Sequence, residues 1–394
     1  MKFDSQTYRV ETDNQLGFKI LIAGIAALLL SAIGYFTHSK QFFFSYLVAY
    51  TFWVSIGLGG LFFVMLSHLT GTVWGIVLRR IIESIMMALP VMAIFFIPLI
   101  FGFHDLYHWS HAEAVAEDPL LQSKAPYLNV PFFIIRTGIY FGIWYLLARK
   151  LYALSLQQDE QPTNEQIVKM RRVSGPGMVL FAVTTAFASF DWIMSLDAHW
   201  YSTIFGVYFF AGSFLGALSF LVIVSAWLHN KDILTGTITI EHYHDLGRLI
   251  FAFVIFWGYM AFSQFFLIWY ANIPEETIWY QHRWTGSWNI ISLFLVIGNF
   301  LIPFVLLMPR AIKRNRNKMF VLAIWILVTH WVDLFWLITP NLHHHGAHFS
   351  WMDLTLFVGM GGIFVSLFWK YLTKGALVPV KDPKLQESIQ FSNA

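Results

Sequence analysis

The feature that most constrains this chain is a series of apolar stretches, each about 20 residues long, that recurs along its length. A helix needs about 20 apolar residues to cross a bilayer. Ten stretches meet that length, and they run approximately over Phe18–Phe36, Phe42–Leu69, Ile82–Phe103, Val130–Ala148, Pro176–Met194, Ile204–Leu228, Leu249–Tyr270, Trp288–Met308, Met319–Ile338 and Trp351–Leu372. A transmembrane barrel would alternate apolar and polar residues instead. The sequence therefore predicts an all-α polytopic membrane protein with ten spans.

Composition supports this prediction and narrows the chemistry. Of the 394 residues, 57% are hydrophobic and 12% are charged, whereas soluble domains carry about 25% charged residues. The chain has no cysteine, which excludes cysteine-ligated iron–sulfur clusters and thioether-attached haem within it. Only His68 and His330 lie within predicted spans, at different depths, and this does not suit a bis-histidine haem. We expect no covalently bound cofactor.

The positions of the basic residues predict the orientation. With the N-terminus in the cytoplasm, 21 of the 25 Lys and Arg residues fall inside, and only Lys40, Lys124 and Arg283 fall outside. Arg136 lies within a span. This split follows the positive-inside rule and predicts that both termini are cytoplasmic. The expected organisation is a cytoplasmic segment 1–17, a transmembrane domain 18–372 and a cytoplasmic tail 373–394. No nucleotide-binding motif is present, and the basic loops are orientation signals rather than a nucleic-acid interface.

Five ionisable residues within the predicted spans are candidates for function, because a charge at the bilayer centre costs about 2.5–3.5 kcal/mol on insertion scales. They are Glu83, Arg136, Asp191, His330 and Asp333. Counting along each span at about 1.5 Å per residue places both aspartates and Arg136 at similar depth in the outer half. The interpretations are a proton relay, part of a quinone pocket, or an ion pair of Arg136 with Asp191 or Asp333 that locks two helix bundles together.

The two aspartates also have similar surroundings, each followed by aromatic residues. They lie on the fifth and ninth spans, which suggests a parallel repeat with halves at about 42–194 and 204–338. Two four-helix bundles would then be accompanied by one flanking helix at each end. His330 and Asp333 are three residues apart and therefore share a helix face. His330 is interpreted either as a hydrogen-bonded core imidazole or as a proton carrier.

Glu83 follows Arg79 and Arg80 at helical spacing. A surface ion pair is one interpretation, and a cytoplasmic point of proton uptake that includes His68 is the other. Most histidines lie in the predicted outer loops: His38, His104, His108, His111, His199, His282, His343, His344, His345 and His348. We interpret them as a polar, partner-facing surface and expect no metal site, because metal binding needs a convergent ligand set.

Two motifs carry a resemblance to a known family. Residues 190–206 read FDWIMSLDAHWYSTIFG, and residues 330–340 read HWVDLFWLITP. The chain resembles the F-type membrane subunit of bacterial alternative complex III, a quinol:cytochrome c oxidoreductase. That subunit is itself similar to the NrfD/polysulfide-reductase family of quinone-reactive membrane subunits. The resemblance extends over the whole chain by span count.

The resemblance implies a multi-pass subunit in the bacterial inner membrane, in contact with lipid and with quinone or quinol nearby. It also implies a paralogous quinol-binding membrane subunit, a periplasmic iron–sulfur subunit and multihaem cytochrome c subunits as partners. Of the family's proton-path positions, Asp191, His330 and Asp333 fall in matching motifs. Arg136, Glu83 and His68 are candidates by depth and charge alone. Alternative functions are a self-contained secondary transporter, since buried charges and a repeat also suit alternating access, or a purely structural scaffold.

Overall fold

Among the described residues, ten helical segments are long and apolar enough to cross a membrane, so the all-α polytopic class is confirmed. The computed structural model describes residues 2–11, 15–160 and 163–393. Eight spans are built on one continuous helix each: α1 (Gln15–Thr37), α2 (Ser39–Thr70), α8 (Val130–Glu160), α9 (Asn164–Trp192), α10 (Phe205–His229), α11 (Ile240–Ala271), α16 (Arg316–Ile338) and α17 (Trp351–Leu372). Within the described ranges the strands are a short antiparallel pair, β1 (Lys2–Asp4) and β2 (Arg9–Glu11).

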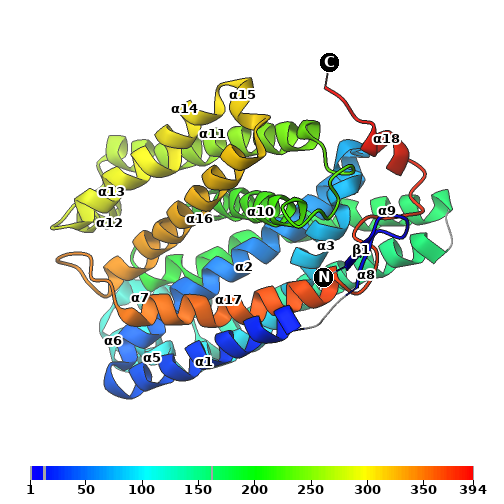
Figure 1. Ribbon diagram of the computed structural model, residues 1–394. Helices are drawn as coiled ribbons and strands as arrows, with labels where there is room; N and C mark the ends of the chain where they lie inside the picture. The colour runs from blue at the N-terminus through cyan, green and yellow to red at the C-terminus, as the bar shows by residue number, and fades with distance from the viewer. Residues whose placement is uncertain (1, 12–14, 161–162, 394) are drawn as a thin grey trace.

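Helices α2 and α10 form the centre of the bundle and pack against each other (Figure 1). Both are mostly buried, whereas α1 exposes most of its surface and packs against α17 along one face. The central contact depends on Gly59, because a Cβ there would lie 2.5 Å from the carbonyl oxygen of Ser213. Small residues let membrane helices approach this closely. Helix α9 contacts α2, and α16 contacts α10, so the two aspartate-bearing helices flank the centre.

Two spans are interrupted, and each contains a proline. The third span consists of a 3₁₀ turn (Trp74–Leu78), α3 (Arg79–Ala88) and α4 (Val91–Phe101), with Pro90 at the break. The eighth span consists of α13 (Trp288–Leu295), the π-helical turn η4 (Val296–Leu301) and α14 (Ile302–Leu307). Pro303 removes a backbone donor from this region. The Trp325 indole donates to the Gly298 carbonyl at 2.7 Å and so replaces part of the lost bonding.

Several helices extend beyond the apolar limits that the sequence suggested. Helix α8 continues to Glu160 rather than ending at Ala148, and α9 begins at Asn164 rather than at Pro176. Hydropathy marks only the part of a helix that contacts lipid, whereas backbone hydrogen bonding continues into polar turns. Most of the predicted inner loop 149–175 is therefore helical.

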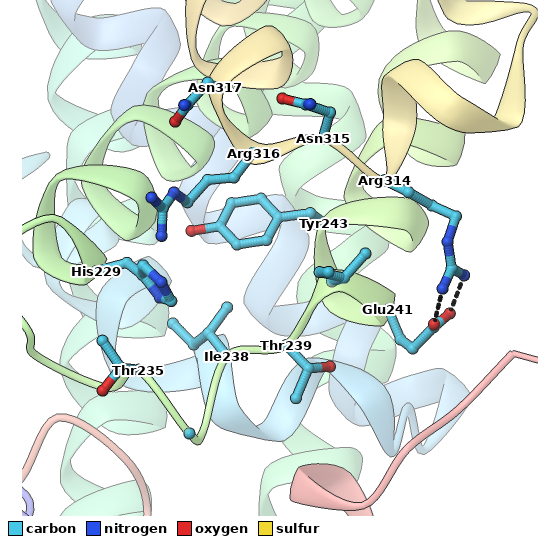
Figure 2. A pocket seen from close by; sticks show the side chains of 12 residues that line it. His229, Thr235, Ile238, Thr239, Glu241, Tyr243, Arg314, Asn315, Arg316 and Asn317 are labelled. Carbon is cyan, nitrogen blue, oxygen red and sulfur yellow. Dashed lines mark hydrogen bonds and ion pairs between the residues drawn. The ribbon is translucent and has the colours of Figure 1, made fainter.

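The two ends of the bundle carry different short elements (Figure 1). One end holds α5 (Phe103–Leu106), α6 (Ala112–Glu117), α7 (Pro119–Lys124) and α12 (Pro274–His282). The other end, where the basic residues gather, holds the strand pair, α15 (Arg310–Lys313) and α18 (Leu385–Ile389). The C-terminal segment is fixed there, because the Leu377 N–H donates to the Tyr8 carbonyl at 2.9 Å. A pocket opens at this basic end beside Arg314 and Tyr243 (Figure 2).

Candidate functional site

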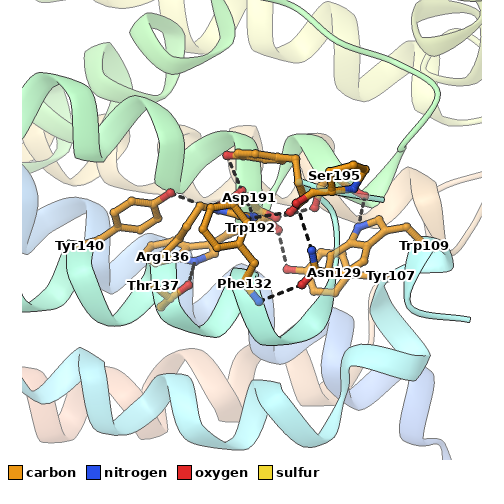
Figure 3. Close-up of polar contacts among 12 residues, drawn as sticks. Tyr107, Trp109, Asn129, Phe132, Arg136, Thr137, Tyr140, Asp191, Trp192 and Ser195 are labelled. Atoms are coloured by element: carbon orange, nitrogen blue, oxygen red, sulfur yellow. Dashed lines mark hydrogen bonds and ion pairs between the residues drawn. The ribbon is translucent and has the colours of Figure 1, made fainter. Parts of the chain in front are cut away.

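Asp191 and Arg136 form a buried, two-pronged ion pair between α9 and α8 (Figure 3). Arg136 Nε donates to Asp191 Oδ2 at 2.9 Å, and its Nη2 donates to Oδ1 at 2.8 Å. Asp191 is 0% exposed and Arg136 is 6% exposed. Both residues belong to the first predicted repeat half. The predicted ion pair of Arg136 with Asp191 is therefore confirmed, but it joins two helices of the same half and does not lock two bundles together.

Two tyrosines complete the surroundings of Asp191. Tyr127 donates to Oδ1 at 2.9 Å and Tyr140 donates to Oδ2 at 2.8 Å. The carboxylate thus accepts four hydrogen bonds, two of them from a cation. The guanidinium also donates to the Tyr127 carbonyl at 2.8 Å and lies 3.8 Å from the centroid of the same ring. Two of these four donors belong to the Arg136 guanidinium, which fits a structural ion pair.

Asp333 has quite different neighbours. The Tyr208 hydroxyl from α10 donates a short hydrogen bond to Oδ1, and the Trp257 indole from α11 donates to Oδ2 at 3.2 Å. Asp333 is 2% exposed. Across the residues that the structure describes, no Lys, Arg or His nitrogen lies within 4.0 Å of this carboxylate. Its charge is therefore met by neutral donors only.

His330 lies on the same side of α16 as Asp333, as their spacing predicted. A Cβ on Gly212 of α10 would lie 3.1 Å from His330 Cε1 and 3.9 Å from Asp333 Oδ2, so both side chains face the same point of α10. Nε2 of His330 lies 2.8 Å from Ser55 Oγ. The same hydroxyl also lies 2.7 Å from the Phe52 carbonyl, and the tautomer of His330 sets whether Nε2 donates to the serine oxygen or accepts from it.

Arg283 is a buried cation that the sequence did not reveal. It precedes α13, where its position suggested a loop charge, yet it is 2% exposed. It donates to the carbonyls of Trp336 and Leu337 in the last turn of α16, at 3.2 and 2.8 Å, and it lies 3.3 Å from the Trp279 ring centroid. Burial lowers the pKa of Arg283 to about 9. The guanidinium remains charged at neutral pH and complements the C-terminal dipole of α16.

Glu83 corrects the prediction of a surface ion pair. It is 0% exposed, and its Oε2 lies 3.1 Å from Arg80 Nη1. Arg80 also contacts Asp159 at 2.5 Å, and it donates to the Ser155 carbonyl at 2.9 Å. Both of these partners lie on the inner extension of α8. The spacing predicted the pair, but the extension of α8 that covers it lies beyond the predicted end of the span at Ala148.

The C-terminal segment also contributes to this inner cluster. Asp382 accepts from Arg79 at 2.8 Å and from Gln158 at 3.1 Å. His68, in the last turn of α2, is 7% exposed, and its Nε2 has no hydrogen-bond partner among the described residues. Among the described residues, no hydrogen bond joins His68 to Glu83. The structure therefore shows no direct link between the two residues of the predicted proton uptake point.

Several outer histidines lie beside one another without forming a ligand set. The rings of His104 and His111 are 3.8 Å apart, those of His343 and His348 are 5.2 Å apart, and His343 Nε2 contacts the Gln41 amide oxygen at 2.6 Å. Over residues 2–11, 15–160 and 163–393, no group of three His, Asp or Glu side chains converges as metal ligands would.

Comparison with known families gives no match. No protein-family model and no curated protein matches this chain. The resemblance to alternative complex III therefore rests on the two motifs at residues 190–206 and 330–340, which contain the two buried aspartates.

Proposed function

We propose that this chain is a membrane subunit of a quinol:cytochrome c oxidoreductase of the alternative complex III type, and that Asp333 exchanges a proton within it. The observation that carries the proposal is the contrast between the two buried acids. Asp191 is neutralised by Arg136, whereas Asp333 meets only the Tyr208 hydroxyl and the Trp257 indole. An ionisable residue within a membrane span that lacks a counterion is a common element of proton relays.

The packing around His330 supports a proton path over a quinone pocket here. Helices α10 and α16 are in direct contact at Gly212 and Gly216, where a Cβ would lie 3.1 Å from the imidazole in both cases. A quinone ring does not fit between helices this close. His330 is hydrogen-bonded to Ser55 of α2, so polar side chains follow one another from Asp333 through His330 to α2. The role of these residues is to hold and pass a proton, while quinol reacts at a neighbouring subunit.

Electron transfer in this proposal belongs to partner subunits, because the chain has no cysteine with which to hold an iron–sulfur cluster. The partners are a paralogous quinol-binding membrane subunit, a periplasmic iron–sulfur subunit and multihaem cytochrome c subunits. Affinity purification of the tagged full-length chain from its native membrane in mild detergent tests this. We expect co-purification of haem, visible as c-type absorbance, together with quinol:cytochrome c activity. A chain that purifies without haem-bearing partners contradicts the assignment.

A secondary transporter is the second candidate, favoured by the break at Pro90 in the third span. Transporters bind substrate where a broken helix exposes its backbone to a polar cavity. Here the neighbouring Leu89 packs on Gly57 of α2, where a Cβ would lie 3.0 Å from the leucine side chain. The break therefore serves helix packing. Purification as a partner-free chain, with substrate-dependent uptake into liposomes, would favour this candidate.

The residue-level test uses Asp333→Asn in the assembled complex. Asp333→Asn should lower proton-coupled turnover by about 100-fold, the lower end of the usual effect of a positioned acid or base, while assembly is retained. Unchanged turnover and proton release in Asp333→Asn would assign Asp333 to structure alone.

A further inference from the structure

A pocket of about 620 Å³ lies at the basic end of the bundle, away from both aspartates (Figure 2). Its wall is formed by His229 at the end of α10, the loop 235–239, the start of α11 and residues 314–317 before and at the start of α16. By the positive-inside assignment this end faces the cytoplasm. No step of the proposed function uses this pocket.

Two helix N-termini converge on the pocket. The capping residue and the first two residues of α11, Thr239–Glu241, line one side, and the corresponding residues of α16, Asn315–Asn317, line another. The first N–H groups of a helix have no partner within the helix. In α11 a capping box of Thr239 and His242 binds the N–H groups of both residues, which leaves those of Ile240 and Glu241 for a ligand. The Asn315 side chain accepts only the Lys318 N–H, at 3.0 Å. Two helix dipoles and free N–H groups at one pocket favour an anion.

Three side-chain atoms in the pocket wall are buried without a hydrogen-bond partner in the described chain: the Tyr243 hydroxyl, Arg316 Nε and His229 Nδ1. Tyr243 is 2% exposed. Figure 2 shows the Tyr243 hydroxyl, the Arg316 guanidinium and the His229 ring directed toward one another across the same space. An unsatisfied buried polar group is costly, so these orphaned groups point to a ligand that supplies their partners.

The charges around the pocket leave one cation free for such a ligand. Arg314 is neutralised by Glu241, with contacts of 2.5 and 2.8 Å. Arg316 has no carboxylate within 4.0 Å among the described residues. The pocket therefore combines an unpaired guanidinium, a tyrosine hydroxyl and two helix N-termini.

We propose that this pocket binds a phosphate-bearing anion, either the headgroup of an anionic phospholipid or a soluble phosphate. Phosphate matches the donors that line this pocket, because guanidinium and backbone N–H groups are its usual partners. Basic pockets between helices at the cytoplasmic surface are typical sites for anionic headgroups. The volume of about 620 Å³ holds a phosphate with an attached glycerol or sugar.

Thermal unfolding of the full-length protein in detergent tests the proposal. One arm titrates dioleoylphosphatidylglycerol against dioleoylphosphatidylcholine in mixed micelles, and the other titrates inorganic phosphate against chloride at equal ionic strength. We expect concentration-dependent stabilisation by one of the two phosphate probes, since a ligand that binds only the folded state raises its stability. Stabilisation by phosphatidylglycerol alone identifies a lipid site, and stabilisation by inorganic phosphate identifies a site for a soluble anion.

Three variants separate the pocket from general surface charge. Arg316→Gln should weaken the apparent affinity about tenfold or more, and Tyr243→Phe about threefold, in line with the loss of charged and neutral hydrogen bonds. Lys318→Gln is the matched control, because Lys318 is exposed on the same helix turn and does not line the pocket. It should change the affinity less than about twofold. Equal weakening by Arg316→Gln and Lys318→Gln, or no stabilisation by either probe, would overturn the proposal.

Discussion

Asp191 and Asp333 lie near the C-terminal ends of α9 and α16, yet they have opposite electrostatic surroundings. Asp191 accepts four hydrogen bonds, two of them from Arg136. Asp333 accepts two, from a tyrosine and a tryptophan. Similar sequence surroundings thus produce one compensated charge and one acid without a counterion. The number and charge of the donors decide which buried acid can exchange a proton.

The arginines on the two sides explain this difference. Arg136 projects from within α8 and reaches the carboxylate of Asp191. Arg283 precedes α13 and reaches the backbone carbonyls of Trp336 and Leu337 instead. It caps the end of α16 and leaves Asp333 to neutral donors. The different positions of the two arginines, one within a helix and one before a helix, therefore produce an ion pair at Arg136 and a helix cap at Arg283.

The largest expected effect on stability is that of Asp191→Asn. The substitution leaves Arg136 buried without a counterion, and breaking a buried pair in this way costs about 3–5 kcal/mol. Unfolding by sodium dodecyl sulfate, followed by circular dichroism in mixed micelles, measures it. If Asp191→Asn and Asp333→Asn lose the same stability, the contrast between the two sites is wrong.

Arg283→Gln should have a smaller effect than a change at either member of the Asp191–Arg136 pair. The variant leaves the Trp336 and Leu337 carbonyls short of donors and removes the contact with the Trp279 ring, at a cost of about 2 kcal/mol. The same unfolding assay applies. Arg136→Gln is the comparison. It should lower the stability more, because it leaves the buried Asp191 carboxylate without its counterion. A milder effect of Arg136→Gln than of Arg283→Gln would contradict this order.

Asp382→Asn tests an ion pair nearer the surface. The side chains of Arg79 and Asp382 are only 11% and 2% exposed, but Gln158 still accepts from Arg79 at 3.1 Å, so the expected loss is about 1.5 kcal/mol. Because Asp382 fixes the C-terminal segment, limited proteolysis should cleave residues 373–393 faster in this variant. Glu387→Gln, in the same segment, is a control that should leave the cleavage rate unchanged.

Asp333→Asn should have the smallest effect on stability, about 1 kcal/mol or less. An asparagine oxygen can still accept from Trp257, and the Tyr208 hydroxyl can rotate to accept from the new amide, because a phenol both donates and accepts. A loss as large as that of Asp191→Asn would show that Asp333 carries a charge which the fold needs.

Much of the architecture could be predicted from the sequence, because spanning a bilayer demands long apolar runs and oriented charges. The count of ten spans and the matching depth of Arg136 and Asp191 follow from that demand. The pairing itself could not be predicted, since depth does not give the direction in which a side chain leaves its helix, and Asp333 lies at similar depth.

The buried charges at the helix ends were harder to predict. Arg283 looked like a loop residue, and the only signal was its position between Trp279 and Trp288. Glu83 looked exposed because it follows two arginines at the inner end of a span. Hydropathy does not show which helices pack over a charged residue, so both sites required tertiary structure.

Infrared difference spectroscopy across a pH titration tests directly whether Asp333, rather than Asp191, exchanges a proton. We expect a carboxyl C=O band that changes with pH in the native protein, persists in Asp191→Asn and is absent from Asp333→Asn. Solvent exchange into D₂O should shift the band, since the proton is exchangeable. A pH-dependent band that survives in Asp333→Asn, or one that is lost in Asp191→Asn, would contradict the assignment of the proton to Asp333.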